Sequence, residues 1–221
     1  AQSFLRRVER ALLPVRWRLA VVVSSPLRRV RQGRLRRGLI WLVRVIWGNP
    51  GYSASYHLCI ALDDLASRSV RVVETGSGLT TLLLRRRPGC PSVTSLEHDT
   101  DWAEVMEKTL PSSPGSEVRR CALVSVAPDV HWYEVDDQIL AEADLVLCDG
   151  PPAETPGGRR GILWALGGGA RPTTVVVDDV QRLDERQLME ELGSRPGAHV
   201  VEIRRHGQKA FGIVELTGDR S

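Results

Sequence analysis

Two patterns of hydrophobic and polar residues divide the chain. Before residue 50, apolar residues recur among arginines at roughly helical spacing, as in RLRRGLIWLVRVIW, which predicts amphipathic helices that break near Pro14 and Pro26. After residue 68, short β-branched or apolar runs alternate with longer segments. The runs expected to form strands are 69–74, 92–97, 118–124, 143–149, 173–179, 199–205 and 210–216.

This alternation indicates an open α/β sheet, because helices connect consecutive parallel strands. Segments long enough for helices include LTTLLLRRR, DWAEVMEKTL and GRRGILWAL. Only HGQK separates the last two runs, so they should form an antiparallel hairpin at the sheet edge. The predicted fold is an α/β domain in residues 51–221 with a mostly parallel sheet of seven strands, preceded by a basic helical arm in residues 1–50.

Charge distinguishes the arm from the rest of the chain. The chain has a net charge of +3, but residues 1–50 contain twelve arginines and one acid, Glu9, which gives this segment +11. Three interpretations stay open: a cap that packs on the domain and closes its cleft, an anchor on a membrane surface, and a basic patch for nucleic acid or an acidic partner. The arm helices are also expected to allow homo-oligomers.

Cysteine spacing and hydropathy favour a cytoplasmic protein. The four cysteines show no CxxC spacing, so neither a zinc site nor a disulfide framework is expected. No apolar run reaches the ~20 residues of a membrane span. A signal peptide fits poorly, because arginines lie on both sides of the short apolar run. Peripheral membrane contact follows only if the arm is an anchor.

Acidic residues gather where the predicted strands end, which is where ligands bind in open α/β sheets. The segment VVETGSGLTT (72–81) has only two glycines of a dinucleotide fingerprint, and its glutamate would repel a pyrophosphate. A carboxylate before a glycine turn suits a cationic ligand instead, such as the ammonium group of S-adenosylmethionine. The acids expected at this edge are Glu74, Glu97, Asp149, Asp178 and Asp179.

On these residues, the sequence resembles the class I S-adenosylmethionine-dependent methyltransferases over about residues 70–216. VVETGSGLTT is similar to their glycine-rich first motif, and SLEHD (95–99) to the motif whose acid binds the ribose hydroxyls. The resemblance implies a Rossmann-like sheet and S-adenosylmethionine as cofactor, with Glu97 on the ribose. The cofactor-binding residues expected on this basis are Glu74, Thr75, Gly76, Ser77, Gly78, Thr80, Glu97, His98, Ser125 and Asp149.

The second half of the chain has two further resemblances. ADLVLCDGPPAETPGGRRGILWAL followed by TTVVVDDVQR is similar to the layout of polysaccharide O-methyltransferases related to glucuronoxylan methyltransferases, although Asp178 stands where that family has histidine. Asp149, Asp178 and Asp179 resemble by position the magnesium ligands of catechol-type O-methyltransferases. Three carboxylates would suit magnesium or another divalent cation that lowers the pKa of an acceptor hydroxyl; alternatively, they cap the following helices.

The sequence therefore predicts an O-methyltransferase for a small-molecule or sugar-containing acceptor. Because the methyl group of the cofactor is already activated, the protein must align the acceptor and remove its proton. Arg159 and Arg160 either hold an anionic acceptor or are solvated at a helix start. Two alternatives stay open: N-methylation, and a nucleic-acid- or membrane-associated binding module without turnover. A nucleic-acid partner is not expected, since no NPPY-like tetrapeptide follows the fourth strand. The candidate catalytic residues are Asp149, Asp178, Asp179 and His206.

Overall fold

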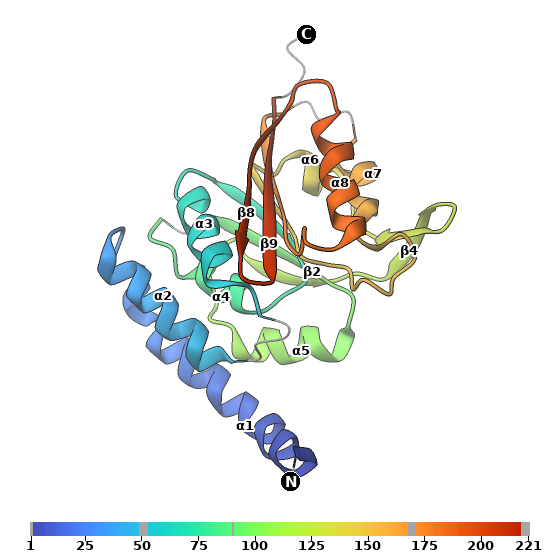
Figure 1. Cartoon of the computed structure of the whole chain (residues 1–221). Coiled ribbons are helices and arrows are strands. Elements are labelled where there is room, and N and C mark those ends of the chain that lie inside the picture. The colour runs from blue at the N-terminus through green and yellow to red at the C-terminus, as the bar shows by residue number, and fades with distance from the viewer. Residues whose placement is uncertain (1, 49–52, 90, 168–170, 218–221) are drawn as a thin grey trace.

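The computed structural model describes residues 2–48, 53–89, 91–167 and 171–217. Its centre is a seven-stranded sheet with the order β3-β2-β1-β6-β7-β9-β8 (Figure 1). The strands from β3 to β7 run parallel, and β9 is antiparallel to both β7 and β8. The predicted mixed sheet and its terminal hairpin are thus confirmed. The strands are β1 (Arg71–Thr75), β2 (Ser92–Glu97), β3 (Glu117–Arg120), β6 (Leu145–Cys148), β7 (Thr173–Val177), β8 (Ala198–His206) and β9 (Lys209–Leu216).

The prediction of one strand over residues 118–124 is wrong. The main-sheet strand β3 ends at Arg120, and β4 (Leu123–Ala127) leaves the sheet to pair antiparallel with β5 (Val130–Tyr133). Pro128 and Asp129 form the turn between them, where Asp129 takes a φ of 57°, a conformation that aspartate tolerates. The residue pattern indicates extended segments here, but not which strands they pair with.

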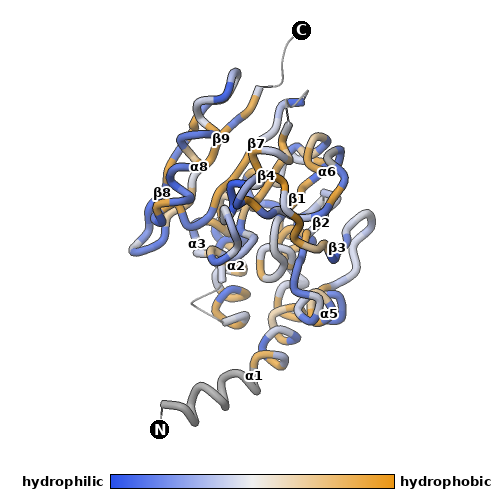
Figure 2. The backbone as a smooth tube through the Cα atoms, turned by 90° about the vertical axis from the view of Figure 1, so that its right-hand side faces the viewer, coloured by the Kyte–Doolittle hydropathy of each residue, from blue (hydrophilic) through white to orange (hydrophobic). Residues whose placement is uncertain are grey.

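Helices cover both faces of the sheet. One hydrophobic cluster joins the sheet to α3, α4 and α5, and a second joins its other face to α6, α7 and α8. Neighbouring residues of β1 divide between the clusters, Val72 into the first and Val73 into the second, because side chains alternate along a strand. Figure 2 shows the hydrophobic strands in the interior. The helices are α3 (Tyr56–Ala66), α4 (Leu79–Arg85), α5 (Thr100–Thr109), α6 (Asp137–Ala141), α7 (Ile162–Ala165) and α8 (Leu183–Gly193), with a short 3-10 turn, η2 (Gly158–Gly161).

The arm consists of α1 (Gln2–Val23), the 3-10 turn η1 (Ser25–Arg28) and α2 (Arg34–Trp47). The α-helix ends at Val23, shortly before Pro26, as predicted. The expected break at Pro14 is wrong, because α1 runs through it. An internal proline removes one backbone hydrogen bond without always ending a helix. None of the described helices is both long and apolar enough to cross a membrane.

The two long arm helices pack side by side and against the α3–α5 layer (Figure 1). Trp17 of α1 contacts Trp47 of α2, with ring centroids 5.9 Å apart, and meets Trp102 of α5 edge-on at 5.2 Å. Arg16 Nε donates a hydrogen bond to the Ile46 carbonyl at 2.9 Å. The inner face of the arm therefore belongs to the same hydrophobic core as the sheet.

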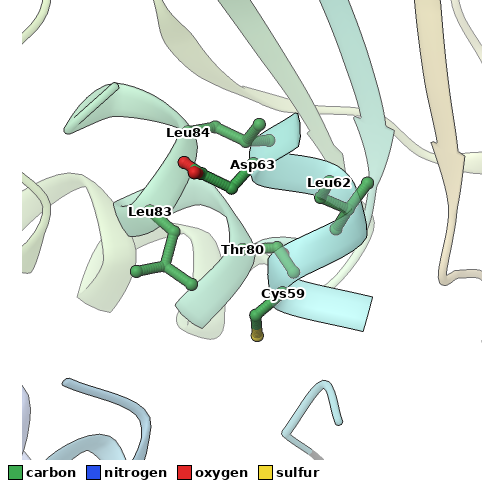
Figure 3. Close-up of a pocket in the computed structure, with 6 residues that line it drawn as sticks. All are labelled: Cys59, Leu62, Asp63, Thr80, Leu83 and Leu84. Carbon is green, nitrogen blue, oxygen red and sulfur yellow. The ribbon is translucent and has the colours of Figure 1, made fainter. Parts of the chain in front are cut away.

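A buried ion cluster also ties the arm to the domain. Asp63 of α3 accepts a hydrogen bond from Arg36 Nε of α2 at 2.6 Å and pairs with Arg87, which follows α4. Arg36 is 2 % exposed and also donates to the carbonyls of Leu27 and Val30. Asp63 lines a cavity of about 10 Å³. Figure 3 shows its side chain between α3 and α4. The arm and domain thus share buried charges as well as apolar contacts.

Candidate active site

A cleft of about 480 Å³ lies at the carboxyl ends of β1, β2, β6 and β7, the edge where open α/β sheets bind ligands. The arm contributes Trp47 to its wall. The structure thus brings together nine of the residues singled out in the sequence. These are Gly76, Ser77, Gly78, Thr80, Glu97, His98, Asp149, Asp178 and Asp179.

The glycine turn is held to the end of β2. Gly76 has a φ of 86°, which favours glycine, and its N–H donates to the Leu96 carbonyl at 2.8 Å. The hydroxyl of Ser77 donates to Glu97 at 2.9 Å, and Trp102 Nε1 donates to the Ser77 carbonyl at 2.9 Å. These bonds fix the turn and the second-strand acid in one geometry on the cleft wall.

Glu97 lines the cleft and has hydrogen-bond acceptor sites that the described residues do not fill. Its side chain is about 5 % exposed and accepts hydrogen bonds from the Ser77 hydroxyl and, at 3.1 Å, from the Asp99 N–H. His98 Nδ1 lies 3.3 Å from Glu97 Oε1, the oxygen that accepts the Asp99 N–H. A carboxylate has about four lone-pair sites, so Glu97 can accept further donors from a ligand.

Glu74 and Thr75 lie behind the cleft and are absent from its described lining. Glu74 is buried and accepts hydrogen bonds from the hydroxyls of Thr80 at 2.8 Å and Ser95 at 2.6 Å. Burial raises its pKa, although these hydroxyls oppose the shift. Thr75 Oγ1 donates to the Gly150 carbonyl and accepts from the Asp149 N–H, which joins the ends of β1 and β6. Both side chains therefore shape the site from behind.

The structure does not bring Ser125 and His206 to the cleft. Ser125 is exposed on β4, which has left the main sheet, and its hydroxyl donates to the Ala127 carbonyl. His206 is exposed at the end of β8, with its ring centroid 3.9 Å from that of His57. Lys209, across the same hairpin turn, lines the cleft and donates to the Ser53 carbonyl at 3.0 Å. The hairpin therefore presents lysine rather than histidine to the site.

Three aspartates converge at the ends of β6 and β7. Asp149, Asp178 and Asp179 each offer an oxygen atom, and these atoms lie within 4.8 Å of one another. Burial and the neighbouring carboxylates raise the pKa of Asp178 and Asp149. Burial also acts to raise the pKa of Asp179, but the bond from Gln181 and the nearby arginines outweigh it and lower the pKa overall.

Arg159 inserts its guanidinium among these carboxylates. It is 4 % exposed, and its Nη2 lies 3.2 Å from oxygens of both Asp149 and Asp179. Its Nη1 donates to the Asp178 carbonyl at 2.6 Å. The sequence left two roles open for Arg159, a contact with an anionic acceptor or a solvated position. In the structure Arg159 is buried instead, and its guanidinium is paired with carboxylates of the protein. Arg160 instead forms a partly exposed ion pair with Glu191.

The chemistry of the aspartates suits a hard divalent cation, which prefers oxygen ligands. Oδ1 of Asp178 is buried and has no hydrogen-bond partner within the described parts of the chain. Against this, Arg159 already neutralises Asp149 and Asp179 in part, and Arg182 lies 2.9 Å from Asp179. The donor set thus fits such an ion, with the arginines as competing cations.

Sequence patterns missed Tyr133 as a site residue. Tyr133 ends β5 and lines the cleft, but its buried hydroxyl has no hydrogen-bond partner among the described residues. Burial raises its pKa well above 10.0, so the hydroxyl stays protonated and can donate. A side chain at Gly150 would collide with this hydroxyl. Only the paired β4 and β5 strands bring Tyr133 to the site, and the sequence pattern did not reveal that pairing.

Comparisons with known proteins identify the fold. No protein-family profile and no curated protein match this sequence. An O-methyltransferase from Bacillus cereus, solved in complex with SAH, is 16 % identical, with a TM-score of 0.56 over 84 % of this chain and 92 % of that one. A proposed caffeoyl-CoA O-methyltransferase from Staphylococcus aureus is 11 % identical, with a TM-score of 0.54 over 80 % and 91 %. The chain therefore has the class I methyltransferase fold.

Proposed function

We propose that the protein is an S-adenosylmethionine-dependent methyltransferase that methylates a hydroxyl group of a small acceptor. The main support is geometric: the glycine turn is hydrogen-bonded to Glu97 in a cleft that the three aspartates also line. The fold agrees, and a structurally similar protein was solved with SAH, S-adenosylhomocysteine, which is the donor after loss of its methyl group.

Cofactor binding follows from the residues on the first wall. Glu97 would accept hydrogen bonds from the two ribose hydroxyls, a bidentate contact suited to a carboxylate. The turn from Gly76 to Gly78 lets the backbone approach the methionine part closely. Trp102 and Trp47 add aromatic surface to the same cleft, which suits the adenine ring. The inner face of the arm would in this way act as a cap.

Methyl transfer needs an aligned acceptor and a base. The acceptor oxygen attacks the sulfonium methyl carbon, a carbon–oxygen bond forms as the carbon–sulfur bond breaks, and SAH leaves as a neutral thioether. The acceptor proton must pass to a base within hydrogen-bond reach. Asp149 and Asp178 are suited to this role, because their raised pKa makes their carboxylates better proton acceptors near neutral pH.

A divalent cation is a further part of the proposal. Asp149, Asp178 and Asp179 would hold it, and the ion would lower the pKa of the acceptor hydroxyl. Arg159 would then have to give up part of its contact with Asp149 and Asp179.

The test is a methyl-transfer screen with labelled S-adenosylmethionine. Compounds with hydroxyl or amine groups would be tested as acceptors after a chelator has removed metal ions from the protein, with and without added magnesium. The proposal predicts transfer to at least one hydroxyl compound and its loss in Asp178→Asn. Transfer that survives exhaustive chelation would remove the metal, and transfer only to amines would replace O-methylation with N-methylation. No transfer to any acceptor, together with no cofactor binding, would contradict the proposal.

A further inference from the structure

The helix α1 has two different faces over its described side chains. Trp17 and Ala20 are buried against the rest of the protein. Val15, Leu19 and Val22 are 63 %, 50 % and 67 % exposed. The spacing of these three residues places them in one stripe, opposite the buried face.

The helix α2 repeats this arrangement. Its buried residues are Arg36, Ile40, Val43 and Trp47. On the opposite side, Leu35, Trp41, Leu42 and Val45 are 65 %, 52 %, 38 % and 44 % exposed. On each helix these large apolar side chains lie away from the buried face, and grouped exposed apolar residues indicate an interaction surface. We call these seven exposed apolar residues of α1 and α2 the outer arm surface.

Exposed arginines lie on the same two helices and in the segment that joins them. Six are exposed, and none of the six forms an ion pair with a carboxylate within the part of the chain whose side chains are described. One lies in α1, three lie at the end of η1 and in the segment after it, and two lie in the first turn of α2. These arginines are Arg18, Arg28, Arg29, Arg31, Arg34 and Arg37.

We infer that the outer arm surface docks on an anionic lipid bilayer. The apolar side chains would enter the boundary between headgroups and acyl chains, while the arginine side chains extend to the anionic headgroups. The +11 charge of residues 1–50 supplies the electrostatic complement. On this inference the arm helices would lie in the plane of the membrane surface.

Charge and hydropathy favour a bilayer over the other occupants. A second copy would meet this surface with the same surface in a twofold dimer, which would bring the unpaired arginines of both copies together. Nucleic acid would satisfy the arginines but leave Leu35, Trp41 and Leu42 without apolar partners. An anionic bilayer satisfies both kinds of side chain.

Vesicle sedimentation of the full chain tests the inference. We expect sedimentation with vesicles of phosphatidylcholine and phosphatidylglycerol, little with phosphatidylcholine alone, and release by salt. The triple variant Val15→Gln, Val22→Gln, Leu35→Gln should bind the anionic vesicles at least about tenfold more weakly. Its matched control is Val70→Gln, Leu183→Gln, which replaces residues of similar exposure, 72 % and 65 %, outside the arm and should bind like the wild type.

A second variant tests the charges independently of the apolar residues. Arg31→Gln, Arg34→Gln should bind anionic vesicles more weakly and with a smaller dependence on salt. Wild-type protein that does not sediment with anionic vesicles, or apolar and arginine variants that bind like the wild type, would overturn the inference. So would a dimer in solution that the triple substitution converts to a monomer, or duplex DNA binding without vesicle binding.

Discussion

Glu74 illustrates how one buried carboxylate should control the pH dependence of stability. Burial raises its pKa above its ordinary value of 4.5, and the hydroxyl groups around it oppose this only in part. The folded protein therefore holds this proton more tightly than the unfolded chain does. The resulting contribution to stability is complete below pH 4.5 and is lost as the pH rises through the folded-state pKa.

Replacing Glu74 with glutamine should remove that loss. We expect the free energy of unfolding of Glu74→Gln to fall less between about pH 4 and 8 than that of the wild type, because each unit of pKa difference is worth about 1.4 kcal/mol. Urea unfolding at several pH values measures this. Glu190→Gln, at an exposed position on α8, is the matched control. Profiles of Glu74→Gln and wild type that run parallel would contradict the prediction.

Substitution of Tyr133 should affect stability and ligand binding in different directions. Its buried hydroxyl has no partner among the described residues, so in the ligand-free protein it costs stability. We expect Tyr133→Phe to keep or raise the free energy of unfolding but to weaken SAH binding by about 0.5–1.5 kcal/mol. Denaturant unfolding and calorimetry measure the two effects. Tyr56→Phe, whose hydroxyl contacts the Arg37 carbonyl, is the control. Unchanged SAH affinity in Tyr133→Phe would show that its hydroxyl does not contact the ligand.

Between elements, the buried ion pair of Arg36 in α2 and Asp63 in α3 links the arm to the domain. Loss of Arg36 would leave Asp63 with one arginine fewer and would leave two backbone carbonyls without their donor. Arg36→Met should therefore lower the free energy of unfolding by about 3 kcal/mol or more. Arg37→Met, exposed on the same helix, should change it by no more than about 0.5 kcal/mol. Equal effects of the two substitutions would mean that the buried cluster adds no stability.

At the scale of the whole molecule, the arm shares the hydrophobic cluster that lies on the α3–α5 face of the sheet. Trp17, Ile40 and Trp47 lie in the same apolar cluster as Leu58 and Leu82. Removal of residues 1–52 should expose this cluster, lower the midpoint of thermal unfolding and promote aggregation. Calorimetry and light scattering on a chain that begins at residue 53 measure these effects. A truncated chain that stays monomeric and unfolds at the wild-type temperature would show that the arm is a separate unit.

Sequence patterns predicted the features that depend on local order along the chain. Alternating apolar runs and helical segments located the main-sheet strands, and the acids at their ends indicated Glu97 and the three aspartates. Arg159 and Tyr133 could not be assigned in this way. Arg159 meets the aspartates only when the η2 turn packs against β5 and α8, and Tyr133 reaches the cleft only through the β4–β5 pairing. Likewise, no local pattern shows that Trp47 of the arm lines the same cleft.

Calorimetric titration with SAH tests the central claim, that the glycine turn and Glu97 form a cofactor site. We expect wild-type protein to bind SAH and Glu97→Ala to bind it about 1.5–3 kcal/mol more weakly, the range for a lost hydrogen bond to a charged group. Glu117→Ala, exposed on β3, should bind like the wild type. Wild-type protein that binds NAD but not SAH, or a Glu97→Ala variant with wild-type affinity, would contradict the account.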